Sequence, residues 1–166
     1  GGLTNATYFA DTGLNIFTVL EKEFLSLEGI PGKTTVDVAL TQKSFAKIYM
    51  MLGINELGRG TTEDFVAKYA EVIKRIQTLQ PRAIIYIQSI MHVSGEKAAT
   101  DPVFTNVNIN ERNIGLATLA NNKDIFYLDV NEAVSDTEGN LMKEYSFDGV
   151  HLKAEYIGTW KEYLAN

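Results

Sequence analysis

The stretch that decides the fold is residues 83–88, AIIYIQ, which begins two residues after Pro81. It is apolar on both faces and rich in β-branched and aromatic side chains, a pattern typical of a strand buried on both sides in a parallel sheet. Residues 47–52, KIYMML, and residues 125–130, IFYLDV, share this pattern. Residues 7–10, TYFA, indicate a fourth and shorter strand.

Amphipathic helical patterns lie between these strands. In the clearest one, apolar side chains recur every three to four residues, and Thr61 or Thr62 can cap its start. The predicted helices cover residues 14–24, 35–40, 65–79, 103–117 and 154–164. Strands that alternate with helices predict an α/β domain with a parallel sheet and right-handed crossovers. The length of 166 residues predicts one domain over residues 1–166.

The composition excludes several functional classes. A formal net charge of -6 argues against a nucleic-acid binder and against an anionic membrane surface as partner. The chain has no cysteine, which excludes disulfides and thiolate chemistry, and its two histidines argue against a zinc site. No apolar run approaches the roughly 18 residues of a membrane span. A secreted or cell-surface bacterial location and a cytoplasmic one both remain open.

Ligands of parallel α/β sheets bind at the carboxyl ends of the strands. Asn55 follows the predicted strand 47–52 and lies between Gly53 and Gly58, and its side-chain amide can donate to a developing oxyanion. The alternative is an ordinary turn, in which Asn and Gly are common. Gly13 follows the predicted strand 7–10 and can bring a bare backbone N–H close to a ligand.

The two histidines also lie near predicted element ends. His92 follows the strand 83–88 and either lines a pocket or makes local hydrogen bonds in a loop. His151 comes three residues after Asp148, just before the last predicted helix. An Asp at this distance can fix the imidazole tautomer, which leaves the other ring nitrogen free to take a proton from a hydroxyl nucleophile. The alternative is a turn at Asp148 and Gly149 that merely precedes a helix.

The segment 136–140, DTEGN, resembles part of a calcium loop, but the comparison fails. With Gly139 as the sixth loop position, Val134 and Tyr145 would occupy the first and twelfth positions, where carboxylates are needed. The segment instead predicts a hairpin-type turn.

Taken together, these motifs resemble the SGNH hydrolase superfamily, also called the GDSL-like lipases and acylhydrolases, over nearly the whole chain. Gly13 matches the second block of that family, in which a glycine N–H joins the oxyanion hole. Gly53-Ile54-Asn55-Glu56 resembles the third block, Gly-x-Asn-Asp, with Glu56 in place of the usual Asp. Asp148-Gly149-Val150-His151 matches the fifth block, Asp-x-x-His.

The resemblance implies a three-layer α/β/α fold with a parallel, flavodoxin-like sheet. It also implies roles for individual residues, with no metal and no organic cofactor. His151 would be the base, Asp148 its orienting partner, and Asn55 and the Gly13 N–H the oxyanion donors. Three further residues are expected to line the substrate pocket, namely Gly53, Glu56 and His92.

One block of the family is missing. The first block, Gly-Asp-Ser, carries the nucleophile after the first strand, and none of the six serines stands in such a motif. We therefore expect the chain to begin downstream of the nucleophile, without the first central strand, which lies between the strands 7–10 and 47–52 in this family. A gap there would leave backbone groups unpaired. We expect an upstream segment, a second polypeptide or rearranged pairing to complete the sheet.

The resemblance implies a serine esterase that hydrolyses a small acyl ester, by analogy an acetylated carbohydrate. The chain alone is expected to be inactive for lack of a nucleophile. The alternative is a non-catalytic relative or inactive fragment that binds a ligand or partner. A flavodoxin-like or receiver-type binding domain shares the α/β pattern, but it does not explain Asp148 and His151, and its phosphate-cradling glycine loops are absent.

Overall fold

The computed structural model describes residues 5–165. Its sheet has three parallel strands, β1 (Lys47–Met50), β2 (Ile84–Gln88) and β3 (Ile125–Leu128), with β2 in the middle. Aromatic rings in register on the three strands stack across one face, with centroids 4.8 and 5.6 Å apart. The strands predicted at residues 47–52, 83–88 and 125–130 are therefore confirmed, and each is slightly shorter than predicted.

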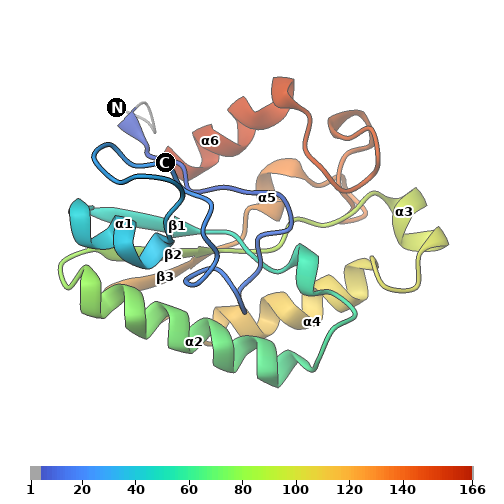
Figure 1. Ribbon diagram of the computed structural model, residues 1–166. Helices are drawn as coiled ribbons and strands as arrows, with labels where there is room; N and C mark the ends of the chain where they lie inside the picture. The colour runs from blue at the N-terminus through green and yellow to red at the C-terminus, as the bar shows by residue number, and fades with distance from the viewer. Residues whose placement is uncertain (1–4, 166) are drawn as a thin grey trace.

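Helices cover both faces of the sheet, which gives three layers (Figure 1). On one face lie α2 (Thr62–Leu79) and α4 (Asn106–Ala117), and on the other lie α5 (Asn131–Val134) and α6 (Ile157–Ala165). The remaining elements are α1 (Val36–Gln42), η2 (Ile54–Glu56), α3 (Gly95–Thr100), η3 (Lys143–Tyr145) and η4 (Ala154–Tyr156). The predicted α/β/α architecture with a parallel, flavodoxin-like sheet is confirmed.

The ends of these helices follow from particular side chains. Thr61 caps α2, since its hydroxyl accepts from the backbone N–H of Asp64 at 3.1 Å. Arg75 of α2 holds α1 through two hydrogen bonds to Asp37, at 2.6 and 2.7 Å. No helix within residues 5–165 has the length and apolarity needed to cross a membrane.

The main core lies between the sheet and the pair α2 and α4. Its almost fully buried side chains include Phe65, Tyr69, Ile85, Ile87, Ile109 and Leu116. On the opposite face, the indole N–H of Trp160 donates to the buried side-chain oxygen of Gln88 at 2.8 Å. This bond fixes α6 against the carboxyl end of β2.

The helix predicted over residues 14–24 is wrong, because this segment forms successive turns. The backbone N–H of Phe17 donates to the Asn15 side chain, and that of Ile16 donates to the Glu56 carboxylate. Side-chain oxygens thus accept from backbone N–H groups that would otherwise bond within a helix. Asparagine side chains are known to compete with the helical backbone in this way. The turns still bury Leu14, Ile16 and Val19.

The strand predicted over residues 7–10 does not form either. Within residues 5–165 this segment has no ladder partner, and the sheet ends at β1 on that side. The predicted strands at Tyr8 and Tyr49 are thus not direct neighbours in a sheet. The short sheet is compatible with a missing first central strand.

Candidate active site

Asp148 and His151 form a hydrogen-bonded pair in the loop before η4. The Nδ1 atom of His151 lies 2.6 Å from Oδ2 of Asp148. The other oxygen, Oδ1, accepts from the backbone N–H groups of Val150 at 2.9 Å and His151 at 2.8 Å, and from the Ser146 hydroxyl at 3.1 Å. These donors, the His151 backbone N–H first among them, hold the pKa of the Asp148 carboxyl well below its usual range. Asp148 is thus an anion suited to orient an imidazole and stabilise its protonated form.

The pair lies at the surface, with His151 80% and Asp148 54% exposed. Within the described residues no hydrogen bond engages Nε2 of His151, so this nitrogen is free to accept a proton. The loop closes through an antiparallel bridge between Ser146 and Leu152. Gly149 turns it with a φ of +77°, a conformation that other residues adopt only with strain.

The loop of the pair is anchored on the start of α3. The backbone N–H of Ser94, the N-cap residue of α3, donates to the carbonyl of Gly149 at 2.8 Å. A Cβ at position 149 would lie 2.5 Å from the Ser94 hydroxyl oxygen. The close approach therefore requires glycine, independently of the backbone conformation.

Asparagines of α4 hold the segment that leads from β2 to Ser94. Asn113 makes two hydrogen bonds with the backbone of Ile90, at 2.8 and 3.0 Å, and Asn106 makes two with that of Val93, at 2.8 and 3.0 Å. These side chains substitute for a neighbouring strand and fix the position of Ser94. This role was not predicted from the sequence, although asparagines at positions 106, 110 and 113 recur at helical spacing.

His92 belongs to the same polar network. Its Nε2 lies 2.7 Å from the side-chain oxygen of Asn110, and its backbone N–H donates to Asn131 at 2.7 Å. His92 therefore makes local hydrogen bonds in a loop, which was the predicted alternative to lining a pocket. The role of His92 as a pocket residue stays a prediction.

The two predicted oxyanion donors come from loops that touch. The side-chain amide of Asn55 donates to the carbonyl of Leu14 at 2.9 Å, which joins the η2 loop to the loop of Gly13. Gly13 is exposed and has a φ of +69°. Within residues 5–165 no acceptor binds its backbone N–H, which is therefore available. The structure thus brings the two predicted donors into neighbouring loops near the carboxyl end of β1.

Glu56 and Gly53 belong to the same short η2 segment as Asn55, with Gly53 at its N-cap. Oε1 of Glu56 accepts from the backbone N–H of Ile16 at 2.5 Å, and the residue is only 2% exposed. Its burial raises the pKa of the carboxyl, against the lowering effect of the Ile16 bond. A Cβ on Gly53 would lie 2.4 Å from Ile90, so glycine is needed there. Both residues pack the loop, and their contact with a substrate stays a prediction.

Among the described serines, Ser146 is the one hydrogen-bonded to the pair. Its hydroxyl donates to Asp148 and not to His151, and it is 9% exposed. Ser94 caps α3, and Ser89 is fully buried and bonded to Asn131. Within residues 5–165 no serine is hydrogen-bonded to the free nitrogen of His151.

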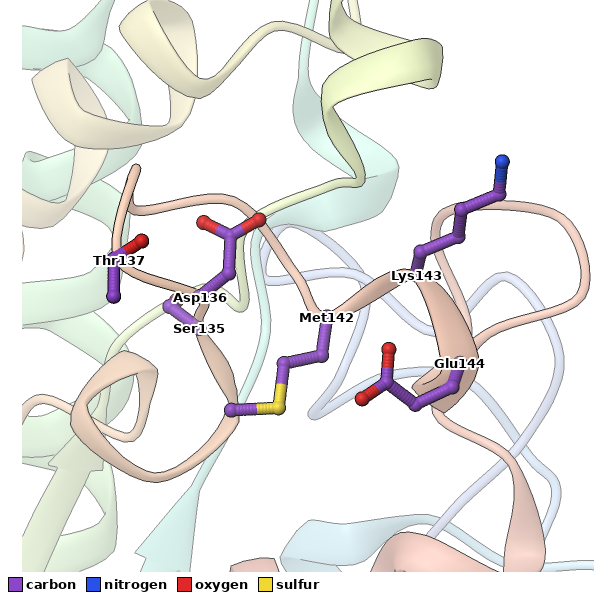
Figure 2. Close-up of a pocket in the computed structure, with 6 residues that line it drawn as sticks. All are labelled: Ser135, Asp136, Thr137, Met142, Lys143 and Glu144. Carbon is purple, nitrogen blue, oxygen red and sulfur yellow. The ribbon is translucent and has the colours of Figure 1, made fainter.

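Two surface depressions lie away from these residues. The larger, about 470 Å³, lies between the arms of the hairpin at residues 135–144 (Figure 2). That turn was predicted, and its bond from the Asp136 N–H to the Asn140 carbonyl at 2.8 Å confirms it. The smaller depression, about 330 Å³, adjoins Phe9 and Phe45. Neither is lined by the pair or by Asn55, and within residues 5–165 no cluster of side chains suits a metal ion.

The profile of the GDSL-like Lipase/Acylhydrolase family matches residues 7–155, which contain all three motifs. The chain belongs to this family. A search of curated proteins gave no match.

Solved structures show the same fold. A carbohydrate esterase family 3 from Talaromyces cellulolyticus is 14% identical over 92% of this chain and 65% of its own, with a TM-score of 0.61. A protein assigned as a GDSL-like lipase from Parabacteroides merdae ATCC 43184 is 13% identical over 92% and 69%, with a TM-score of 0.66. A protein assigned as a platelet activating factor from Streptococcus pneumonia is 24% identical over 72% and 57%, with a TM-score of 0.65. The match thus spans between 57% and 69% of the length of these three proteins.

Proposed function

We propose that residues 1–166 form one domain that supplies the base and the oxyanion donors of a serine esterase acting on small acyl esters. The observation that carries this proposal is the 2.6 Å contact between Nδ1 of His151 and an ionised Asp148. The nucleophilic serine would come from a polypeptide segment outside residues 1–166. That segment, in the same or a second polypeptide, would also complete the sheet.

In the proposed reaction, Nε2 of His151 takes the serine proton while the serine oxygen attacks the ester carbonyl carbon. The carbonyl oxygen becomes an oxyanion, which accepts hydrogen bonds from the Asn55 amide and the Gly13 N–H. The Asn55 amide has a second N–H beyond the one given to Leu14, so one donor remains for this purpose. His151 then returns the proton to the leaving alcohol, and an acyl-serine remains.

Water completes the cycle in the proposed mechanism. His151 removes a proton from water, which attacks the acyl-serine, and the carboxylic acid leaves as the serine oxygen is protonated again. Asp148 stays ionised throughout and stabilises the imidazolium that forms twice in each cycle.

An acetyl ester of a carbohydrate is the proposed substrate class. Two structural neighbours support it by analogy, the carbohydrate esterase family 3 and an acetyl esterase mutant solved with an acetate ion. A ligand-binding domain without activity is the second candidate. It is favoured by the fact that no described serine is hydrogen-bonded to His151.

Expression of the complete coding sequence tests the proposal. Hydrolysis of p-nitrophenyl acetate is measured for that protein, for His151→Ala and for Val107→Ala, a control at an exposed position of α4. We expect turnover in the parent and in the control, and its loss in His151→Ala. Equal turnover in all three would contradict the proposed role of His151 as the base. A coding sequence without Gly-Asp-Ser before Gly1, together with no turnover, would favour the binding domain.

A further inference from the structure

Phe147 is the most exposed large apolar side chain of the described chain, at 91%. It comes directly before Asp148, in the turn that carries the pair of Asp148 and His151. Single exposed apolar side chains are common on protein surfaces, and Val107 and Ile114 of α4 are examples. Phe147 differs from these two in its place beside the pair and in the contacts that hold its turn and its ring.

The turn that carries Phe147 is held firmly at its base. Next to the antiparallel bridge that closes the turn, the backbone N–H of Lys153 donates to the carbonyl of Tyr145 at 2.8 Å. The rings of Tyr145 and Tyr156 stack with their centroids 4.0 Å apart. The backbone at Phe147 is therefore fixed before any ligand arrives, which lowers the entropy cost of binding on its ring.

The ammonium group of Lys153 orients the ring of Phe147. Its Nζ lies 4.2 Å from the ring centroid and donates to the carbonyl of Glu144 at 2.6 Å. A cation is attracted by the negative face of an aromatic ring. The ammonium group has three N–H donors, so two remain for oxygen atoms of a ligand. One face of the ring thus lies beside Lys153, and the high exposure of Phe147 leaves the opposite face open to solvent.

The proposed mechanism brings the alcohol part of the ester to this turn. Nε2 of His151 returns a proton to the leaving alcohol, whose oxygen must come within about 2.6–3.2 Å of that nitrogen. Four residues of chain separate the Cα atoms of Phe147 and His151 by at most about 14 Å, and the closed turn brings them nearer. Asn55 and Gly13, the proposed donors to the carbonyl oxygen, lie on other loops. Phe147 therefore shares a turn with the residue that meets the alcohol.

We propose that the open face of Phe147 binds a pyranose ring in the alcohol part of the substrate, and that Lys153 donates to an oxygen of the same sugar. Phe147 thereby determines the preference for carbohydrate esters over other acetyl esters. The inference rests on the proposed function, which supplies the base and the substrate class.

An exposed aromatic ring suits a sugar better than an acyl chain. The C–H bonds of a pyranose make its faces apolar, and their hydrogens are attracted to the negative face of an aromatic ring, while the hydroxyl groups at the rim stay in water. A long acyl chain is bound by burial on several sides, which so exposed a side chain does not offer. Neither of the two surface depressions is lined by residues 146–152. An acyl chain is the competing ligand.

Kinetics of the complete protein on two acetyl esters test the inference. The probes are β-D-glucose pentaacetate, which carries an acetyl group on every hydroxyl oxygen, and ethyl acetate, whose alcohol is too small to reach Phe147. Acetate release gives kcat/KM for each ester, and the ratio of the two values cancels any effect on the shared acetyl chemistry. Phe147→Ala should lower this ratio roughly three- to tenfold, through a higher KM for the sugar ester. Val107→Ala, at an exposed position of α4, should leave the ratio unchanged.

Two further substitutions at position 147 separate a stacked sugar from an acyl chain. Phe147→Trp keeps an aromatic face and should keep the ratio. Phe147→Leu keeps an apolar side chain without that face and should lower the ratio as Phe147→Ala does. Lys153→Met should also lower the ratio, because it removes the donor and keeps the length of the side chain. A ratio that Phe147→Leu preserves would overturn the stacked sugar in favour of the acyl chain.

Binding without catalysis separates this inference from the esterase proposal. Saturation-transfer NMR follows β-D-glucose pentaacetate, at about 1 mM, with the complete protein carrying His151→Ala and with one that also carries Phe147→Ala. We expect transfer to the ring protons of the sugar in the first protein and its loss in the second.

The outcomes of these experiments are distinct. No transfer with the first protein, equal transfer with both, or an unchanged ratio of kcat/KM values in Phe147→Ala would each overturn the role of Phe147. Transfer that depends on Phe147, in a protein whose parent hydrolyses neither ester, would support Phe147 as the sugar contact. That result would count only against the esterase proposal.

Discussion

The two carboxylates of the candidate site, Asp148 and Glu56, are held in opposite ways. Asp148 is 54% exposed, and every donor to it lies within three residues along the chain. Glu56 is 2% exposed, and its donor, Ile16, lies 40 residues away. The pKa of Asp148 is lowered by its donors, and the pKa of Glu56 is raised by its burial.

The difference shows that the two halves of the site depend on different parts of the fold. The hydrogen bonds to Asp148 all come from one turn and are local, and Ser94 holds that turn on α3 through a single backbone bond to Gly149. The proposed oxyanion side is held by tertiary contacts between the loops of Gly13 and Asn55. Substitutions in the first half should therefore change activity with little effect on stability, and substitutions in the second half should change both.

The largest expected effect is on the activity of the complete enzyme carrying His151→Ala. Loss of the base should reduce kcat on the order of 10⁴-fold or more. Because the ring is 80% exposed, the free energy of unfolding should change by less than about 0.5 kcal/mol. Steady-state kinetics and urea denaturation measure the two quantities. A large loss of stability would mean that the turn of Asp148 and His151 is not an independent local unit.

Asn55→Ala should come next. Removal of one oxyanion donor is expected to lower kcat about 10²–10³-fold with little change in KM. The lost bond to Leu14 should also cost about 1 kcal/mol of stability. Asn108→Ala is a matched control. Asn108 lies on α4, and its side-chain amide donates a similar bond of 2.9 Å to the carbonyl of Val103. Comparable kinetic losses in both variants would argue against a role for Asn55 in the reaction.

This contrast also explains what the sequence could predict. The strands predicted at residues 47–52, 83–88 and 125–130, helix α2 and the turn at Asp148 follow from short-range patterns, and these form, whereas the strand predicted at residues 7–10 does not. The sequence predicts a helix over residues 14–24, yet the backbone N–H of Ile16 donates to the side chain of Glu56, 40 residues away. No local pattern contains that contact. The asparagine contacts of α4 with residues 90–93 were missed for the same reason.

The third prediction concerns stability alone. Glu56→Ala leaves the Ile16 N–H without its acceptor in a buried place, which should cost about 1–3 kcal/mol in urea denaturation. Glu56→Gln keeps an acceptor for Ile16 and should cost less. Asp148→Ala, at a half-exposed site, should cost less than Glu56→Ala because water can reach the freed donors. Equal costs at positions 56 and 148 would contradict the comparison of buried and exposed carboxylates.

The smallest effects are the pH dependences, which should have opposite signs. The pKa of Glu56 is raised in the folded chain above its ordinary value of 4.5, so the folded state binds the proton more tightly. Its protonation therefore stabilises the fold fully below pH 4.5, and this contribution is lost as the pH rises through the folded pKa. The pKa of Asp148 is lowered from 3.8, so its contribution is present above pH 3.8 and lost as the pH falls towards its folded pKa.

Urea denaturation from about pH 3 to 7 separates the two contributions. The difference in unfolding free energy between the parent chain and Glu56→Gln should shrink or change sign as the pH rises above 4.5. For one proton, this difference changes by at most about 1.4 kcal/mol per pH unit. The difference between the parent and Asp148→Asn should instead shrink as the pH falls below 3.8. If both stability differences change with pH in the same direction, burial does not govern the ionisation of Glu56. Hydrogen-bond donors to both of its carboxylate oxygens would then hold it ionised in the folded chain.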